Sequence, residues 1–216
     1  MPEVDAVLGI GANGDIVKTC DKALCGIVTT SFPNKCYLSI NDERIISTPS
    51  HWAYLKIAEG CDNRCSYCAI PGIRGGFRSR TIESCVDEAK ALAESGVKEL
   101  ILIAQDTTKY GQDLYGKYSL DILLKELVKI DGIEWIRLFY CYPQRITDSL
   151  IDVIANEEKV CSYIDIPLQH SDKTVLKNMN RVGDGDDYRA LISKMRKAIP
   201  GLAPVSYTHL RAHETE

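Results

Sequence analysis

The sequence predicts an α/β fold built from parallel strands, and two observations lead to this prediction. From Trp52 onward, short apolar segments alternate with longer segments whose apolar residues recur every three or four positions. This alternation is typical of βαβ units, in which helices connect consecutive parallel strands. The strand segments also contain few polar residues, as expected for parallel strands that are buried on both faces. We therefore expect residues 52 to about 200 to form four βα units of a barrel or an open sheet.

Each predicted element has its own signals. The expected strands cover residues 54–58, 97–104, 133–141 and 163–168. The expected helices cover residues 81–95, 119–130, 147–156, 172–179 and 186–199. Thr81 is a suitable N-cap for the first of these helices, and Gly96 is a suitable residue to end it.

The first part of the chain has a different pattern. Residues 4–10 are expected to form a short strand, and residues 15–24 are expected to form a helix. Residues 26–50 are rich in Thr, Ser, Asn and Pro, which favours an extended linker.

Composition and charge exclude several classes of protein. The formal net charge is −4 and the pI is about 5.6, so direct binding of nucleic acid is not expected. No apolar run approaches the roughly 18 residues of a membrane span, and the N-terminus has no signal-peptide pattern. The nine cysteines are odd in number and unevenly spaced, which favours a reducing cytoplasm over a secreted disulfide scaffold.

Three cysteines form the strongest chemical signal in the chain. Cys61, Cys65 and Cys68 have the spacing C-x3-C-x2-C directly after the first expected strand of the α/β region. Three thiolates this close together can bind three irons of a cubane iron–sulfur cluster. The fourth iron would then be open to a substrate, as the open position of a catalytic zinc site is. Gly60 would allow the tight turn that precedes the first cysteine.

Two other uses of these cysteines are open. A structural zinc site is one alternative, but it usually needs four ligands, and no second C-x2-C or suitable histidine pair is present. A thioredoxin-like redox pair is the other, and the third cysteine does not fit it. The remaining cysteines are expected not to be ligands: Cys20, Cys25, Cys36, Cys85, Cys141 and Cys161.

In parallel α/β folds the functional residues lie at the carboxyl ends of the strands. Besides the cysteine triad, this rule selects residues after the other three strands: Gln105, Asp106, Tyr142 to Arg145, Gln169 and His170. All of them would face the same rim.

The triad, with an aromatic residue just before its third cysteine, resembles the signature of the radical S-adenosylmethionine superfamily. Four longer stretches resemble its methylthiotransferases: YLKIAEGCDNRCSYCAIPGIRGGFRSR, ELILIAQDTTKYG, WIRLFYCYPQRITDSLIDVIA and YIDIPLQHSDKTVLKNMNR. Together they cover most of residues 50–181. This resemblance implies a partial radical-SAM (βα) barrel that binds a 4Fe–4S cluster and S-adenosylmethionine, and generates a 5′-deoxyadenosyl radical.

The resemblance also implies roles for individual residues. Cys61, Cys65 and Cys68 would hold the cluster, and Tyr67 would lie beside the adenine of S-adenosylmethionine. Gln105 and Gln169 would contact S-adenosylmethionine, or alternatively serve in hydrogen bonding within their loops.

Further roles are open between two alternatives. His170 is a site residue or a packing residue. The basic residues Arg74, Arg78 and Arg80 either neutralise carboxylates at a rim beside the cluster or form a solvated charged face.

Within the family, the segment AQDTTKYG resembles the branch that modifies a ribosomal protein, whereas the tRNA-modifying branch reads closer to GQNVNSY. The implied reaction adds a methylthio group to the β-carbon of an aspartate in the decoding-centre protein of the small ribosomal subunit. The electron donor is unknown. The alternatives are a tRNA adenosine methylthiotransferase and a non-catalytic metal-binding module.

The chain departs from the family pattern at both ends. Residues 1–48 resemble the end of an N-terminal methylthiotransferase domain plus a linker, without the three cysteines expected to hold a second, auxiliary 4Fe–4S cluster. Residues 49–202 match a partial radical SAM domain. Residues 203–216 have no apolar period and are expected to be a non-native tail that adds no strand. The resemblance therefore implies that this chain would not complete methylthio transfer alone.

Overall fold

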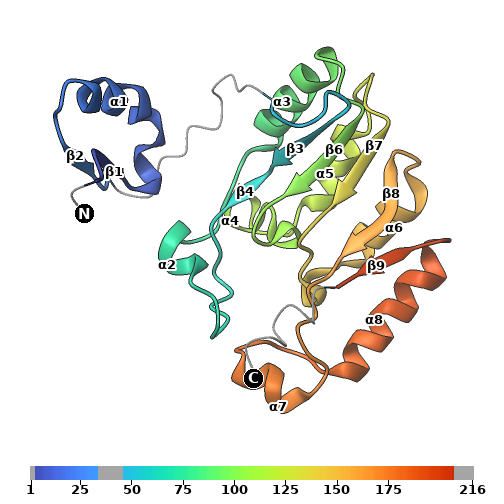
Figure 1. Ribbon diagram of the computed structural model, residues 1–216. Helices are drawn as coiled ribbons and strands as arrows, with labels where there is room; N and C mark the ends of the chain where they lie inside the picture. Colours follow the sequence, from blue (N-terminus) through green and yellow to red (C-terminus); the bar gives the residue numbers. More distant parts are fainter. Residues whose placement is uncertain (1–2, 34–45, 207–216) are drawn as a thin grey trace.

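A parallel sheet of five strands forms the centre of the molecule, whose computed structural model describes residues 3–33 and 46–206 (Figure 1). Neighbouring strands follow the order of the sequence, and all four pairings are parallel. The strands are β3 (Trp52–Lys56), β6 (Glu99–Ile103), β7 (Trp135–Leu138), β8 (Val160–Asp165) and β9 (Ala203–Val205). The predicted α/β fold with parallel strands is confirmed.

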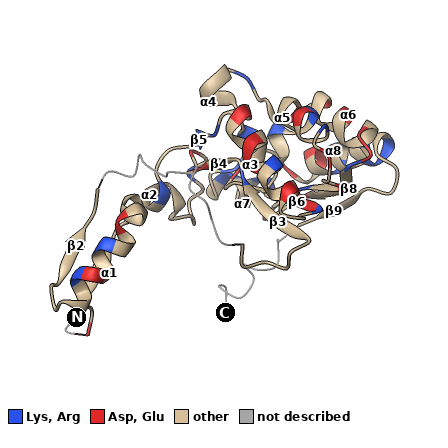
Figure 2. Ribbon diagram, turned by 90° about the horizontal axis from the view of Figure 1, so that it is seen from above, with Lys and Arg blue, Asp and Glu red and all other residues tan. Residues whose placement is uncertain are grey.

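Five helices follow these strands along the chain, and four of them cover one face of the sheet. They are α3 (Ile82–Glu94), α5 (Leu120–Leu127), α6 (Asp148–Asn156), α7 (Lys173–Asn178) and α8 (Gly185–Ala198). Figure 2 shows α3, α5, α6 and α8 on the same side of the strands. The hydrogen-bonding side chains of Thr81 and Thr147 cap α3 and α6, and Gly96 ends the first of these helices with a φ of 98°. The expected bounds of α3 and α6 are within one residue of the observed ones, whereas α5 ends three residues earlier than expected.

Alternate strand residues form the core between the sheet and the helices. Leu55, Leu102, Leu138 and Ile164 are fully buried there, in one cluster with the apolar faces of the helices. The residues between them point to the opposite face, where Tyr54 is 38% exposed. On that face Ile101 of β6 is buried, so the expected burial on both faces holds for the middle of β6 and not for Tyr54 of β3.

A small unit precedes the sheet and includes an element that the sequence analysis missed. It consists of β1 (Ala6–Leu8), the 3-10 helix η1 (Ile10–Asp15), α1 (Ile16–Leu24) and β2 (Thr29–Ser31). Strands β1 and β2 pair in parallel, so residues 29–31 are not the extended linker that their polar composition suggested. Residues 34–45 of the predicted linker lie outside the described part.

The strand β9 corrects the prediction for the end of the chain. Its three residues pair in parallel with Tyr163 to Asp165 of β8, although residues 203–216 were expected to add no strand. Leu202, directly before the strand, is 8% exposed and packs in the core, which helps to hold this short strand against the sheet. The origin of the tail stays a prediction, and residues 207–216 are outside the described part.

Shorter elements lie between the strands and the main helices. They are β4 (Ala58–Glu59), α2 (Ile70–Arg74), β5 (Arg78–Ser79), α4 (Gln112–Tyr115), and the 3-10 helices η2 (Thr107–Lys109) and η3 (Pro143–Arg145). None of the helices in residues 3–33 and 46–206 combines the length and hydropathy of a membrane-spanning segment.

Candidate metal centre

The three predicted ligand cysteines lie in a loop that starts and ends at the same place. β4 and β5 pair as antiparallel strands, and the Cys61 N–H donates to the carbonyl of Gly75 over 3.1 Å. Gly60 has a φ of 81°, and a Cβ atom there would lie 2.2 Å from the carbonyl oxygen of Gly76. Only glycine fits this crossing, because both the backbone conformation and the close approach exclude a side chain. The residues between the crossing points form what we call the cysteine loop, residues 60–77.

All three thiols line one cavity at the carboxyl ends of the strands. Its volume is about 140 Å³, and Cys61, Cys65 and Cys68 all contribute to its wall. Cys61 is buried and the other two are half-buried. Burial raises the pKa of the Cys61 thiol, so this thiol would require a bound cation to persist as a thiolate at neutral pH.

Two glutamines from different strands complete the cavity. Gln105 follows β6 and Gln169 follows β8, and both line the wall. The side-chain oxygens of both residues are buried, and no described residue donates a hydrogen bond to them. Buried polar atoms without partners are uncommon and costly, so these two acceptors fit a bound molecule that carries N–H or O–H donors.

The chemistry of the donor set fits a cluster better than a single ion. Among residues 3–33 and 46–206, no three His, Cys, Asp or Glu side chains converge closely enough to bind one metal ion. A mononuclear zinc site needs such convergence on one point. In a cubane cluster each thiolate binds a different iron, so the three sulfurs stay apart around a larger group. Three thiols from one loop therefore match the donor set of a cubane cluster.

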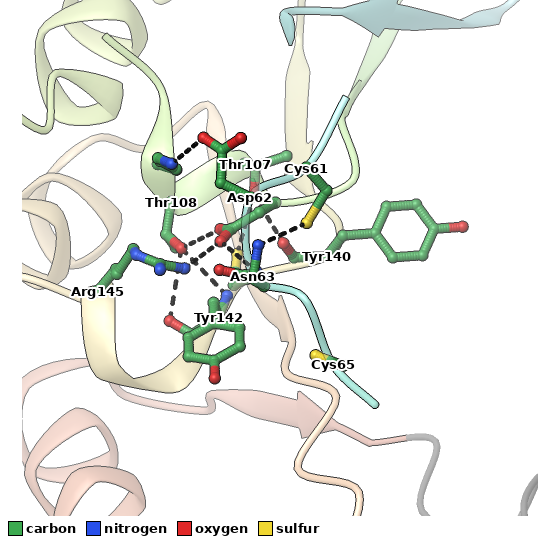
Figure 3. Close-up of polar contacts among 12 residues, drawn as sticks. Cys61, Asp62, Asn63, Cys65, Thr107, Thr108, Tyr140, Tyr142 and Arg145 are labelled. Atoms are coloured by element: carbon green, nitrogen blue, oxygen red, sulfur yellow. Dashed lines mark hydrogen bonds and ion pairs between the residues drawn. The ribbon is translucent and has the colours of Figure 1, made fainter. Parts of the chain in front are cut away.

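A buried carboxylate connects the cysteine loop to two other rim segments. Asp106 accepts hydrogen bonds from Asn63 Nδ2 over 3.1 Å and from Thr108 Oγ1 over 2.6 Å, and it forms an ion pair with Arg145. The Tyr142 N–H in turn donates to Thr108 Oγ1 over 3.1 Å. Figure 3 shows Asn63, Thr108 and Arg145 converging in this network while the Tyr140 ring points away from it. The loops after β6 and β7 thus fix the position of the cysteine loop.

The segment after α7 holds the cysteine loop from the other side. Three consecutive residues, 179–181, contact three consecutive loop residues, 64–66. The Ser66 N–H donates to the carbonyl of Met179 over 3.1 Å. Asn180 Nδ2 donates to the carbonyl of Arg64 over 2.8 Å, and Arg181 Nη1 lies 3.8 Å from Cys65 Sγ.

Backbone strain is concentrated around the same cavity. In the described part of the chain, four non-glycine residues have a positive φ: Arg64, Tyr140, Gln169 and Asn180. The first three line the cavity, and the fourth holds the cysteine loop, which carries all three thiols. Such conformations cost free energy and persist where the surroundings enforce them, which is typical of functional sites.

The other residues selected from the sequence have different surroundings. Tyr67 lines the cavity, and burial raises its pKa to about 12. His170 is exposed, and its Nδ1 accepts a hydrogen bond from the Asp172 N–H over 2.9 Å, so it stabilises a turn. His170 is not among the residues that line the cavity.

The expected basic rim is also different from the one that the structure contains. Arg80 is 5% exposed and binds Glu88 and the carbonyl of Lys56 below the loop. Arg74 lies 3.5 Å from the buried carboxylate of Glu59. None of the expected residues Arg74, Arg78 and Arg80 lines the cavity. Two other arginines, Arg64 and Arg181, do line it.

Sequence reasoning missed Asn63, Tyr140 and Arg181. Arg181 is 116 residues from Cys65, and it follows a helix rather than a strand, so the strand-end rule does not select it. The one feature of the sequence that points to Arg181 is its position as the last residue of the family-like stretch YIDIPLQHSDKTVLKNMNR. Asn63 lies inside the triad, but nothing in its spacing indicates a contact with Asp106, 43 residues away.

Comparison with curated proteins gives close relatives. The chain is 52% identical over 204 residues to the "Ribosomal protein uS12 methylthiotransferase RimO" of Lachnoclostridium phytofermentans, and this match covers 94% of the chain and 46% of that protein. The protein of the same name from Desulforamulus reducens has the same identity and coverage. A third, from Heliobacterium modesticaldum, is 48% identical, with 44% of its length covered. The chain thus spans less than half the length of these relatives.

Comparison with solved structures gives the same fold at low identity. The methyltransferase TsrM from Kitasatospora setae, described with cobalamin and a 4Fe–4S cluster bound, has a TM-score of 0.57 and 19% identity over 72% of this chain and 30% of its own. Streptococcus suis SuiB has a TM-score of 0.53 and 16% identity over 75% of this chain and 33% of its own.

A family model supports the same relationship over most of the chain. The model "Radical SAM superfamily" matches residues 55–211, a range that includes the cysteine loop and all strands from β6 to β9. The chain therefore belongs to the radical S-adenosylmethionine superfamily.

Proposed function

We propose that this chain is the catalytic segment of a methylthiotransferase that modifies ribosomal protein uS12. The proposal rests on about 50% identity to curated proteins that carry this activity in their names, over 94% of the chain. The resemblance described above implies that the target is the β-carbon of an aspartate. A small-subunit ribosomal protein would be the substrate partner, and the cytoplasm, where free thiols persist, would be the site of action.

One observation carries the catalytic part of this proposal. Three thiols from one short loop line a cavity that also contains two buried amide oxygens without partners among the described residues. We propose that Cys61, Cys65 and Cys68 each bind one iron of a 4Fe–4S cluster. When bound, the cluster supplies the electron that splits S-adenosylmethionine into methionine and an organic radical.

The surrounding residues would bind and orient S-adenosylmethionine. Gln105 and Gln169 each have a free acceptor atom in the cavity, which suits the amino, hydroxyl or adenine donors of that molecule. Tyr67 and Tyr142 give the wall aromatic surface, which suits an adenine ring. The half-enclosed cavity would also exclude water from the reacting groups.

Anaerobic reconstitution with iron and sulfide tests the catalytic part. We expect a brown chain with about four irons that cleaves S-adenosylmethionine after reduction. A Cys20→Ser variant is a matched control, because Cys20 is exposed and lies outside the cavity. A colourless chain that binds zinc instead would contradict the proposal.

A chimera tests the substrate. Residues 49–202 of this chain would replace the matching part of a complete RimO relative, and the chimera would be offered uS12 in ribosomal subunits and, separately, tRNA. We expect mass spectrometry to detect one methylthio group on uS12. Modification of tRNA alone would show that the chain belongs to the tRNA-modifying branch.

A further inference from the structure

A buried cation lies against one of the three site thiols. Arg181 is 7% exposed, its Nη1 lies 3.8 Å from Cys65 Sγ, and its Nη2 donates to the carbonyl of Pro167 over 2.7 Å. The ionisable groups that act on it are Tyr142, Tyr67 and Cys65. A guanidinium that has lost most of its water is normally matched by a carboxylate. No carboxylate of residues 3–33 and 46–206 forms an ion pair with Arg181, so the matching negative charge would come from the site itself.

Neighbouring groups fix the guanidinium in this place. Its Cζ lies 4.4 Å from the centre of the Tyr142 ring, a cation–π distance, and the backbone N–H of Arg181 donates to the carbonyl of Leu176 over 2.8 Å. With the contact to Pro167, the guanidinium is held at two points and the backbone of the same residue at a third. Its charge therefore stays beside Cys65 instead of moving into solvent.

We propose that Arg181 raises the reduction potential of the cluster by holding a positive charge and an N–H donor against the sulfur of Cys65. This inference rests on the proposed function, because it requires Cys65 to be a cluster ligand. Reduction adds a negative charge to the cluster, and a nearby cation or hydrogen-bond donor stabilises the reduced form more than the oxidised form. Arg181 would thus be a positioning residue that makes the cluster easier to reduce.

The preceding residue provides a control that separates charge from mechanical support. Asn180 holds the same loop through its hydrogen bond to the Arg64 carbonyl, but it has no charge. It has a φ of 55°, a conformation that glycine adopts readily, so Asn180→Gly keeps the backbone and removes only the amide. If mechanical support of the loop controlled the potential, this variant would change it as well.

The test is a potentiometric titration of the reconstituted chain, followed by electron paramagnetic resonance of the reduced cluster without S-adenosylmethionine. We expect Arg181→Met to shift the midpoint to a more negative potential, and Arg181→Lys, which keeps the charge, to shift it less. We expect Asn180→Gly to leave the midpoint unchanged. An unchanged midpoint in Arg181→Met with full iron content would overturn the inference, as would an equal shift in Asn180→Gly.

Other outcomes are also decisive. If Arg181→Met loses its cluster, Arg181→Gln replaces it as the neutral variant, and a wild-type midpoint in that variant overturns the inference. If the wild-type chain binds no cluster, the proposed function fails first, and this inference fails with it.

Discussion

Asn63 donates a hydrogen bond from Nδ2 to Oδ2 of Asp106 over 3.1 Å, and this bond connects the cysteine loop to the end of β6. Asp106 is 1% exposed, and it also binds Thr108 and Arg145. The carboxylate therefore lies where three rim segments meet. Because the chain between Cys61 and Cys65 has no regular secondary structure, this contact is part of what gives the loop a single conformation.

Substitution of Asp106 by leucine leaves the Arg145 guanidinium without its partner in a largely buried place. We expect the free energy of unfolding to fall by about 2–4 kcal/mol, measured by urea denaturation of the chain without cofactors. The double variant Asp106→Leu/Arg145→Leu should recover part of this loss, because it removes the unpaired charge. Asp186→Asn is the control, since Asp186 is exposed and pairs with an exposed arginine. A loss in Asp106→Leu no larger than in this control would contradict the role of the network.

A methyl group at Gly60 would collide with the backbone at the returning end of the cysteine loop. The distances from its Cβ to the carbonyl oxygens of Gly76 and Gly75 would be 2.2 and 2.7 Å, and the φ of 81° adds strain. We expect Gly60→Ala to lose most of the iron bound after reconstitution. Gly72→Ala is the matched control in the same loop, because a Cβ there meets no atom within 4 Å. Equal iron content in the two variants would show that the crossing does not position the thiols.

The sequence predicts the parts of this molecule that depend on local pattern. Thr81 as the cap of α3 and Gly96 as its end can be recognised from the few residues around them. The cysteine triad can be recognised from the spacing of its three residues. The burial of Arg80 and the turn made by His170 could not be predicted, because both depend on partners that only the folded chain brings close. β2 and β9 were missed for a related reason. Each has only three residues, too few to show an alternating pattern of apolar side chains. Each becomes a strand by pairing with another part of the chain, β2 with β1 and β9 with β8.

Cys141 gives the chain a dependence on pH that is separate from the site. Complete burial raises the pKa of its thiol to about 12, whereas an unfolded chain would release this proton near pH 8.5. Between these values the unfolded state loses a proton that the native state keeps, so stability falls as the pH rises. We expect this thiol to account for about 2 kcal/mol of lost stability at pH 10 relative to pH 7.

Urea denaturation at the two pH values, without cofactors, measures this effect. Cys141→Ala should show a smaller loss between pH 7 and pH 10 than the wild-type chain, whatever its stability at pH 7. Cys20→Ala, at an exposed position, should lose as much as the wild type. Identical losses in all three proteins would show that the thiol ionises equally in the native and unfolded states.

The two cavity glutamines should contribute directly to binding of S-adenosylmethionine. Gln105→Leu and Gln169→Leu keep the approximate size of the side chain and remove the free acceptor. We expect each to weaken binding to the reconstituted chain about tenfold, the equivalent of one good hydrogen bond, as measured by isothermal titration calorimetry. His170→Leu should leave the affinity unchanged, since this side chain serves a turn outside the cavity. Weaker binding in His170→Leu, with no change in the glutamine variants, would show that His170 and not the glutamines contacts S-adenosylmethionine.

The iron content of serine variants at the three thiols is the sharpest test that these residues hold the cluster. Cys61→Ser, Cys65→Ser and Cys68→Ser would each be reconstituted anaerobically beside the wild-type chain and Cys20→Ser, and the iron and the cleavage of S-adenosylmethionine would be measured. We expect about four irons and cleavage in the wild type and in Cys20→Ser, with loss of cleavage and of most iron in each of the other three. Full iron and normal cleavage in any one of those three would contradict this expectation.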